Sequence, residues 1–182
     1  AIAQTTPGFA YLHKAGFRDP LPAHTVRLRY IAHASFLIQT DDGLSAVTDF
    51  TGFIGNVDFI PDVVTMNHAH STHWTANPDP LIANVLPGWG DFGEGVDHHV
   101  DLGSMLVRNV PTDIRSWDGT VETNGNSIFV FEAAGLCIAH LGHLHHEPSD
   151  EQYAALGRMD VVMAPVDGGL TLPLENMMNV LR

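Results

Sequence analysis

The sequence contains little cysteine, little positive charge and no long apolar run, and each shortage excludes a class of protein. A single cysteine, Cys137, cannot form an intramolecular disulfide, so the fold must depend on its hydrophobic core. Eight Lys and Arg residues stand against 21 Asp and Glu, and the net charge of −13 lacks the basic surface that nucleic acid requires. No apolar run reaches the roughly 18 residues of a membrane helix. We therefore expect neither a nucleic-acid nor a membrane partner.

The composition is typical of one folded domain, with 182 residues of which 45% are hydrophobic and 16% charged. Residues 1–24 show no periodic pattern and contain several Pro and Gly, so we expect an irregular N-terminal arm before a domain over residues 25–182. The start Ala1-Ile2-Ala3-Gln4 resembles the end of a signal-peptide cleavage site, which favours a periplasmic or secreted location. Proteolysis or an expression boundary is the alternative origin of this start.

The secondary-structure pattern is a run of strands followed by alternating strands and helices, which indicates an α+β fold. Ser149 with Gln152 three residues later predicts a capped helix over Asp150–Leu156, and Pro173–Leu181 is a second predicted helix. The segment Asn77–Leu86 stays open between a short helix and a loop. Alternating or continuous apolar runs predict strands at Thr25–Ile31, Ser35–Gln39, Leu44–Phe50, Asp62–Met66, Ser104–Val110, Ser127–Glu132, Leu136–Ala139 and Asp160–Ala164.

Histidine is unusually abundant, with 12 residues. Imidazole is the commonest metal-binding side chain, and residues i and i+2 of an extended segment share a face, so neighbouring rings can reach one ion. The pattern predicts a metal site; a pH-titrating surface or hydrogen bonds to the backbone are the alternatives. His33, isolated before the strand that begins at Ser35, could line such a site. Two groups directly follow predicted strands: His68, His70 and His73, and then His140, His143, His145 and His146.

Six segments along the chain carry motifs that occur together in one known family: Tyr30–Ile38, Thr48–Phe50, Asp62–His73, Gly125–Glu132, Gly135–Gly142 and Met163–Gly169. Together they resemble the metallo-β-lactamase superfamily, and more narrowly its lactonase-like branch. The resemblance implies a four-layer αββα sandwich with the metals at one edge of the sheets. In the family's usual motif, His-x-His-x-Asp-His, the first two His hold one metal and the Asp and last His hold the other.

This chain departs from that family pattern at several positions. Thr72 stands where the motif has its Asp, and His143 stands where a bridging Asp is usual. A neutral imidazole has one lone pair and cannot bridge two cations, so we expect either one metal held mainly by His or two metals arranged differently. No His lies between His99 and His140 to supply the usual third ligand, and the chain ends at Arg182, before the family's last strand and its His. We expect that strand to be missing here or supplied by another chain, in a homo-oligomer or with a second polypeptide.

The function predicted from these residues is a metal-dependent hydrolase that uses metal-activated water on a small-molecule ester, lactone, amide or phosphoester. Zinc is the expected metal, one or two ions, with Fe, Cu or Ni possible at a nitrogen-rich site. Asp49 and Asp167 are predicted to orient ligands or to act as a general base. A non-hydrolytic metal store or carrier, a degenerate enzyme, and a redox protein with His-bound Fe or Cu are the alternatives. The predicted metal ligands are His68, His70, His73, His140, His143 and His145.

Overall fold

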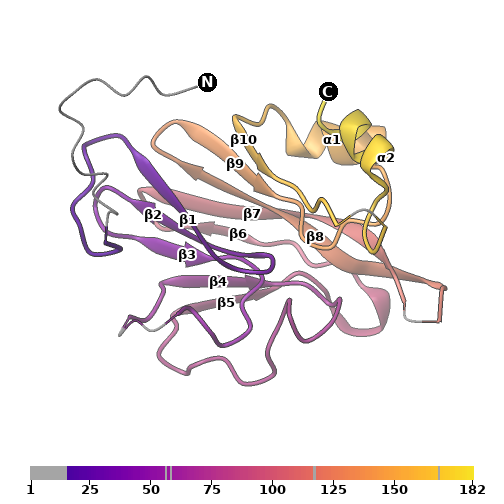
Figure 1. Cartoon of the computed structure of the whole chain (residues 1–182), viewed down its shortest axis with the longest axis horizontal. Helices are drawn as coiled ribbons and strands as arrows, with labels where there is room; N and C mark the ends of the chain where they lie inside the picture. Colours follow the sequence, from indigo (N-terminus) through magenta and orange to yellow (C-terminus); the bar gives the residue numbers. More distant parts are fainter. Residues whose placement is uncertain (1–15, 56, 58, 117, 168) are drawn as a thin grey trace, which may run out of the picture.

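Two five-stranded sheets pack face to face in the computed structural model, which describes residues 16–55, 57, 59–116, 118–167 and 169–182 (Figure 1). Most of the predicted N-terminal arm, including Ala1 to Gln4, therefore lies outside the described residues. The first sheet has the order β1-β2-β3-β4-β5 and the second β10-β9-β8-β7-β6. The first sheet contains β1 (Val26–Ala32), β2 (Ser35–Thr40), β3 (Ser45–Val47), β4 (Val63–Met66) and β5 (Asn84–Pro87). The second contains β6 (His99–Asp101), β7 (Met105–Arg115), β8 (Val121–Ala133), β9 (Leu136–His140) and β10 (Val161–Met163).

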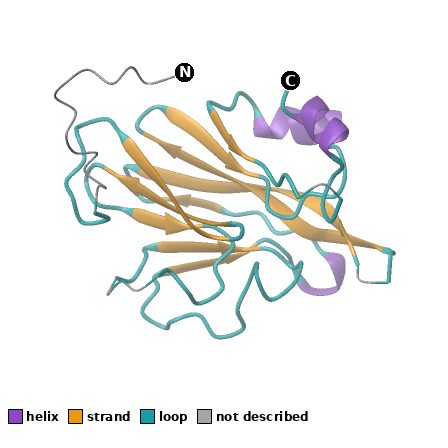
Figure 2. Cartoon of the chain, viewed as in Figure 1, coloured by secondary structure: helices purple, strands orange, loops and turns teal. Residues whose placement is uncertain are grey.

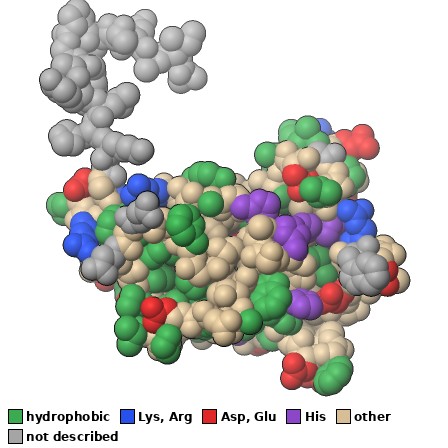
Figure 3. Space-filling view, turned by 60° about the horizontal axis from the view of Figure 1, so that its bottom comes forward, with side chains coloured by type: hydrophobic (Ala, Val, Ile, Leu, Met, Phe, Trp, Pro, Cys, Tyr) green, Lys and Arg blue, Asp and Glu red, His purple; other side chains and the backbone are tan. Residues whose placement is uncertain are grey.

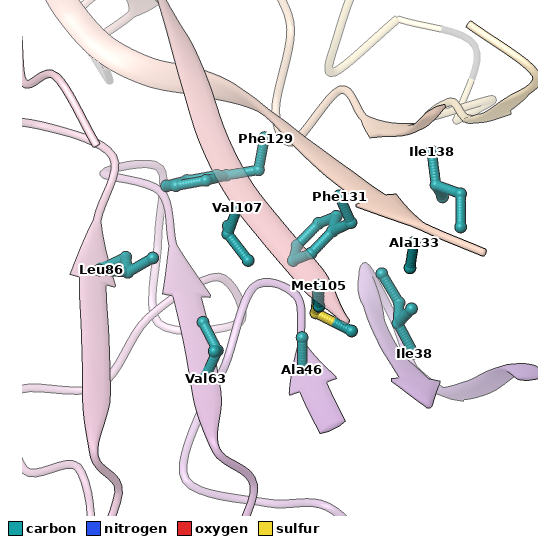
Figure 4. Close-up of a cluster of buried hydrophobic side chains, with 10 residues drawn as sticks. All are labelled: Ile38, Ala46, Val63, Leu86, Met105, Val107, Phe129, Phe131, Ala133 and Ile138. Carbon is teal, nitrogen blue, oxygen red and sulfur yellow. The ribbon is translucent and has the colours of Figure 1, made fainter. Parts of the chain in front are cut away.

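The main core fills the space between the two sheets (Figure 4). A second cluster lies on the outer side of the second sheet, where Leu156 and Met177 of the two helices pack against strand residues. These helices are α1 (Asp150–Leu156) and α2 (Leu174–Val180), drawn together at one side of the molecule in Figure 2. The central core residues are Ile38, Ala46, Val63 and Leu86 from the first sheet, with Met105, Val107, Phe129, Phe131, Ala133 and Ile138 from the second.

The sandwich predicted from the motifs is confirmed, with one difference in its outer layers. In the described part of the chain both α-helices cover the second sheet, and no α-helix lies between β1 and β5. Loop residues instead pack on the first sheet's outer face, where Phe59, Trp74 and Trp89 contact buried strand residues such as Val47 and Val64. The loops that follow β3, β4 and β5 thus complete the layer that a helix would supply.

Local sequence signals explain the ends of most elements. Ser149 and Gln152 form the predicted capping box of α1, which ends at Gly157 with φ of 72°. The segment left open between helix and loop ends in β5, which pairs in parallel with β4. A short 3-10 helix, η1 (Asp91–Gly93), follows in the glycine-rich loop.

The long β7–β8 ribbon extends beyond both strands predicted there. A register shift between Thr112 and Ile114 bends the ribbon, after which Ile114 pairs with Glu122. The added residues are mostly polar, so this extension cannot be predicted from apolar runs in the sequence. Strand β10 is an edge strand of the second sheet and pairs with β9. The partner chain that we expect beside this edge stays a prediction. No described helix is long and apolar enough to cross a bilayer.

Candidate metal centre

Four histidines from three separate loops converge at one edge of the sandwich. His70 and His73 follow β4, His33 lies in the turn between β1 and β2, and His143 follows β9. The ligand atoms of His33, His70 and His73 all lie within 4.8 Å of one another, and the Nε2 atoms of His33 and His73 are 3.2 Å apart. The His143 ring centroid is 4.7 Å from that of His73 and 5.1 Å from that of His70. Figure 3 shows histidine side chains gathered on one face.

A buried carboxylate fixes the orientation of His73. The Nδ1 atom of His73 donates to Asp49 Oδ2 at 2.5 Å, and Asn67 Nδ2 donates to Asp49 Oδ1 at 2.9 Å. Asp49 has no exposed surface and a φ of 41°, an uncommon backbone conformation that directs its side chain inward after β3. Because Nδ1 of His73 is engaged, its Nε2 is left for the histidine cluster. A carboxylate behind a metal-binding imidazole is a recurrent arrangement that sets ring orientation and basicity.

Two buried asparagines hold the loops beneath this site, and one of them, Asn67, also connects the two sheets. Asn67 Oδ1 accepts a hydrogen bond from Ser127 N at 2.7 Å, while its amide group donates to Asp49. Asn126 Oδ1 accepts from His143 N at 2.8 Å, and its Nδ2 donates to Leu141 O at 3.2 Å. These amides hold the loops that carry the histidines. Sequence reasoning missed both, because one Asn after a strand (Asn67) and one Asn within a strand (Asn126) give no metal-site signal.

The donor set leaves buried nitrogen atoms without partners. His140 is 3% exposed and His143 7% exposed, and the Nδ1 atom of each is buried without a hydrogen bond. The other ring nitrogen of His140, Nε2, donates to Ala34 O at 2.8 Å. An unsatisfied buried nitrogen is costly, by about 1–3 kcal/mol. Converging imidazoles with spare lone pairs fit a divalent cation of the zinc type.

Thr72, which replaces the motif Asp, contacts a histidine of the cluster. Its Oγ1 atom shares a hydrogen bond with His70 Nδ1 at 2.7 Å. The remaining ring nitrogen of His70, Nε2, is then the atom available to an ion. Thr72 therefore orients His70 in the way that Asp49 orients His73, although with a neutral oxygen and closer to solvent.

Two of the predicted ligands have other partners in the structure. His68 forms an ion-pair contact with Glu122 through Nδ1 and stacks on Trp89 at a centroid distance of 5.1 Å. His145 uses both ring nitrogens on the backbone, because Nε2 donates to Leu170 O at 2.6 Å and Nδ1 accepts from Arg115 N at 3.1 Å. His145 thus has no free lone pair, and His68 lies outside the group formed by His33, His70 and His73.

Asp167, for which the sequence predicts the same role as for Asp49, forms its hydrogen bonds mainly with residues close to it in the chain. Its Oδ1 atom accepts backbone hydrogen bonds from Gly169, Leu170 and Thr171, each at 3.1 Å. Burial alone would raise the pKa of Asp167, but these hydrogen bonds outweigh burial and lower the pKa below its usual value. The side chain also lines the pocket beside the histidines. The structure therefore brings together His70, His73, His140 and His143 with Asp49 and, at the pocket wall, Asp167.

His33 lies outside both histidine groups of the sequence, so its neighbours in the chain give little sign that it belongs to a metal site. It has a φ of 49° in the two-residue connection between β1 and β2, a conformation that few non-glycine residues adopt. The only signal in the sequence was its position directly before the predicted strand that begins at Ser35. Glu122, the partner of His68, carried no signal at all, because it lies in the polar extension of β8.

Two histidines of the cluster, His70 and His143, are held in the neutral state that metal binding requires. Burial, reinforced by the neighbouring rings of His73, His145 and His70, lowers the pKa of His143 to about 4. Burial also lowers the pKa of His70, and the rings of His73 and His33 act in the same direction. The site is thus prepared for a cation down to mildly acidic pH.

Acid should destabilise the metal-free protein between pH 6.5 and about 4. In this range His143 is protonated in the unfolded chain but neutral in the folded protein. The free energy of unfolding therefore decreases as the pH is lowered. One such group contributes a slope of about 1.4 kcal/mol per pH unit. Urea unfolding of the metal-free protein at pH 7 and pH 5 measures this slope. His143→Gln should flatten it, and an unchanged slope in that variant would contradict the assignment.

A pocket of about 460 Å³ opens beside the cluster. His33, His70, His73, His140 and His143 line one part of it. The rest is formed by residues of β1, β2 and the loop that follows β10. A pocket of this size is typical of a small-molecule site.

Comparison with known proteins agrees with this geometry. A sequence profile of the beta-lactamase superfamily domain matches residues 27–182. A candidate Zn-dependent hydrolase of the metallo-β-lactamase superfamily from Thermotoga maritima is similar, at 26% identity and a TM-score of 0.61, over 86% of this chain and 69% of that one. A candidate metal-dependent hydrolase from Parabacteroides distasonis is 16% identical, with a TM-score of 0.62 over 85% of this chain and 76% of that one. A search of curated proteins gives no match.

The chain therefore belongs to the metallo-β-lactamase superfamily. The resemblance drawn from the motifs is confirmed for the superfamily and its fold. The lactonase-like branch stays a prediction.

Proposed function

We propose that this protein is a metal-dependent hydrolase of small molecules. The observation that carries the proposal is the convergence of His33, His70 and His73, whose ligand atoms lie within 4.8 Å of one another at the wall of a pocket. The Asp49 carboxylate behind His73 adds the partner that such a ligand needs. Membership of a superfamily with hydrolase relatives supports the same reaction class.

The residues that would hold the ion are His33, His70, His73 and His143, with His140 Nδ1 buried nearby. Zinc is the first choice, and Fe, Cu or Ni are alternatives because every donor is an imidazole nitrogen. When bound, such a cation supplies Lewis acidity and an activated water. The protein's own contribution is to keep His70 and His143 neutral by burial, and to orient His73 through Asp49 and His70 through Thr72.

The two predicted carboxylates then have different roles. Asp49 accepts hydrogen bonds on both oxygens and is fully buried, so it is a positioning residue for His73. Asp167 lines the pocket and has one oxygen engaged by backbone amides. Its other oxygen remains for a water or a substrate proton, so Asp167 is the better candidate for a general base of the two.

One observation favours a second candidate function. The ring cluster contains no carboxylate ligand, since Thr72 and His143 occupy the motif positions where acidic residues are usual. An all-imidazole site also suits a metal store or carrier, or a redox centre with Fe or Cu.

The decisive experiment loads the protein separately with Zn²⁺, Fe²⁺, Cu²⁺ and Ni²⁺ and measures both stoichiometry and turnover. Stoichiometric Zn²⁺ binding with hydrolysis of an ester, lactone, amide or phosphoester supports the hydrolase. His73→Ala is the matched variant, because it removes the ring that Asp49 orients. Tight metal binding without turnover on any of these substrates would overturn the hydrolase in favour of a store or carrier.

A further inference from the structure

The histidine cluster forms only one side of the pocket, and the other lining residues are largely apolar. Asp167 is the one acidic side chain among them. The loop that follows β10 contributes several of these apolar side chains. It lines the same pocket as His140, at the end of β9, and His143. The apolar lining residues with large side chains are Tyr30, Phe36, Met163, Pro165, Val166 and Leu170.

Three of these apolar side chains are unusually exposed. Tyr30 is 60%, Val166 75% and Leu170 69% exposed, although each borders the pocket. Exposed apolar surface around a concave site marks a place where an apolar group binds and removes that surface from water. Tyr30 also packs edge-on against Phe36 at 5.4 Å, which joins two of the lining residues into one aromatic wall.

Hydrogen bonds fix the loop that carries this surface. Asp167 Oδ1 accepts the backbone N–H groups of Gly169, Leu170 and Thr171. From the other side, Arg115 Nη2 donates to the carbonyl oxygens of Gly169 and Leu170 at 3.4 Å and 3.1 Å. The apolar wall is therefore formed before a ligand arrives, which lowers the entropic cost of binding.

The side chains of the pocket offer no positive charge of their own to an anionic substrate. No Lys or Arg is among the described residues that line it, while Asp167 lines it and Asp49 is buried behind His73. Arg115, close in the structure, directs its guanidinium at backbone carbonyls. Sites for phosphate groups usually offer Arg, Lys or a helix N-terminus. The overall charge of −13 adds repulsion at longer range.

We propose that the substrate is an uncharged carboxylic ester or lactone with an apolar acyl chain that lies on Tyr30, Val166 and Leu170, and that phosphoesters are excluded. This inference rests on the proposed hydrolase function. In the reaction the water oxygen bonds to the acyl carbon and the acyl C–O bond breaks. One water proton goes to the departing alkoxide oxygen, which gives an alcohol and a carboxylic acid.

Chain-length dependence tests the inference in the Zn²⁺-loaded protein. From p-nitrophenyl acetate to butyrate to octanoate, kcat/KM should rise by up to about fourfold per buried methylene. p-Nitrophenyl phosphate and bis(p-nitrophenyl) phosphate should be turned over at least 100-fold more slowly. Preference for either phosphate, or no dependence on chain length, overturns the substrate class while leaving the hydrolase function intact.

A binding measurement on metal-free protein separates the two proposals. The neutral fluorescent probe N-phenyl-1-naphthylamine should bind saturably and be displaced by methyl octanoate but not by inorganic phosphate. Val166→Asp and Leu170→Asp should each weaken probe binding at least fivefold. Leu81→Asp is the matched control, since Leu81 is 72% exposed and lies outside the pocket. If all three variants bind the probe equally, the apolar wall is not a binding surface. If the probe binds as expected but no ester is hydrolysed, the hydrolase function fails alone.

Discussion

Replacing His73 by alanine is expected to lower the affinity for Zn²⁺ by more than about 100-fold, which exceeds the 10–100-fold loss typical of an orienting partner. His73 is 2% exposed and has its Nδ1 atom committed to Asp49, so its Nε2 atom is held in one direction. The same Nε2 lies 3.2 Å from His33 Nε2, and the His143 ring is close on another side. The His73 ring thus contacts the rings of His33, His70 and His143.

Competition with a chelator of known affinity measures this loss, and Asp49→Asn provides a graded comparison. The amide keeps the size of the carboxylate but removes the charge that stabilises the His73 imidazole as a donor. We expect a 10–100-fold loss of affinity in Asp49→Asn. Circular dichroism and urea unfolding of both variants verify that the fold is retained. Equal Zn²⁺ affinities in the wild type and in His73→Ala would contradict the assignment of His73 as a metal ligand.

A second pair of variants distinguishes the observed cluster from the family motif. The motif assigns His68 to a metal, whereas in this structure His68 contacts Glu122 and Trp89 and His33 lies in the cluster. His33→Ala should therefore cost more Zn²⁺ affinity than His68→Ala. The reverse order would show that the ion is held by the motif histidines.

Much of the fold could be predicted from local patterns, because those patterns also decide the local energetics. The α1 capping box, the strands β1 and β2 and the buried β4 each follow from residues adjacent in the chain. The part of the site that could be predicted is the position of the two histidine groups, because each group follows a strand and strand ends meet at one edge of the sheets. Asp49 was recognisable because it follows a strand beside that edge.

The remaining features depend on contacts between distant segments. His33 reaches His73 across 40 positions, and Asn67 reaches Ser127 across 60, so neither pairing has a local signature. The hydrogen bonds that occupy His145 come from Arg115 and Leu170, each at least 25 residues away. A histidine with ligand-like spacing can thus be diverted by backbone groups that only the tertiary fold brings near it.

Gly142→Ala is expected to destabilise the protein by about 3–5 kcal/mol, since it combines backbone strain with overpacking. Gly142 has φ of +61°, a conformation that disfavours any side chain. A methyl group there would overlap Asn67 Nδ2 and would lie 2.5 Å from Asn126 Oδ1. Both amides are fully buried and fully engaged in hydrogen bonds, so neither can move without leaving a polar group unsatisfied.

The matched control is Gly135→Ala in the turn between β8 and β9. Gly135 has φ of +76° but no atom within 4 Å of the added methyl group, so only the backbone cost of about 1–2 kcal/mol applies. Urea unfolding of the two variants at pH 7 measures the difference. Because Asn67 holds Asp49 and Asn126 holds the His143 backbone, any Gly142→Ala protein that folds should also bind Zn²⁺ more weakly than Gly135→Ala. Equal stability and equal Zn²⁺ affinity in the two variants would show that the asparagines yield freely, and that they do not hold the histidine loops in place.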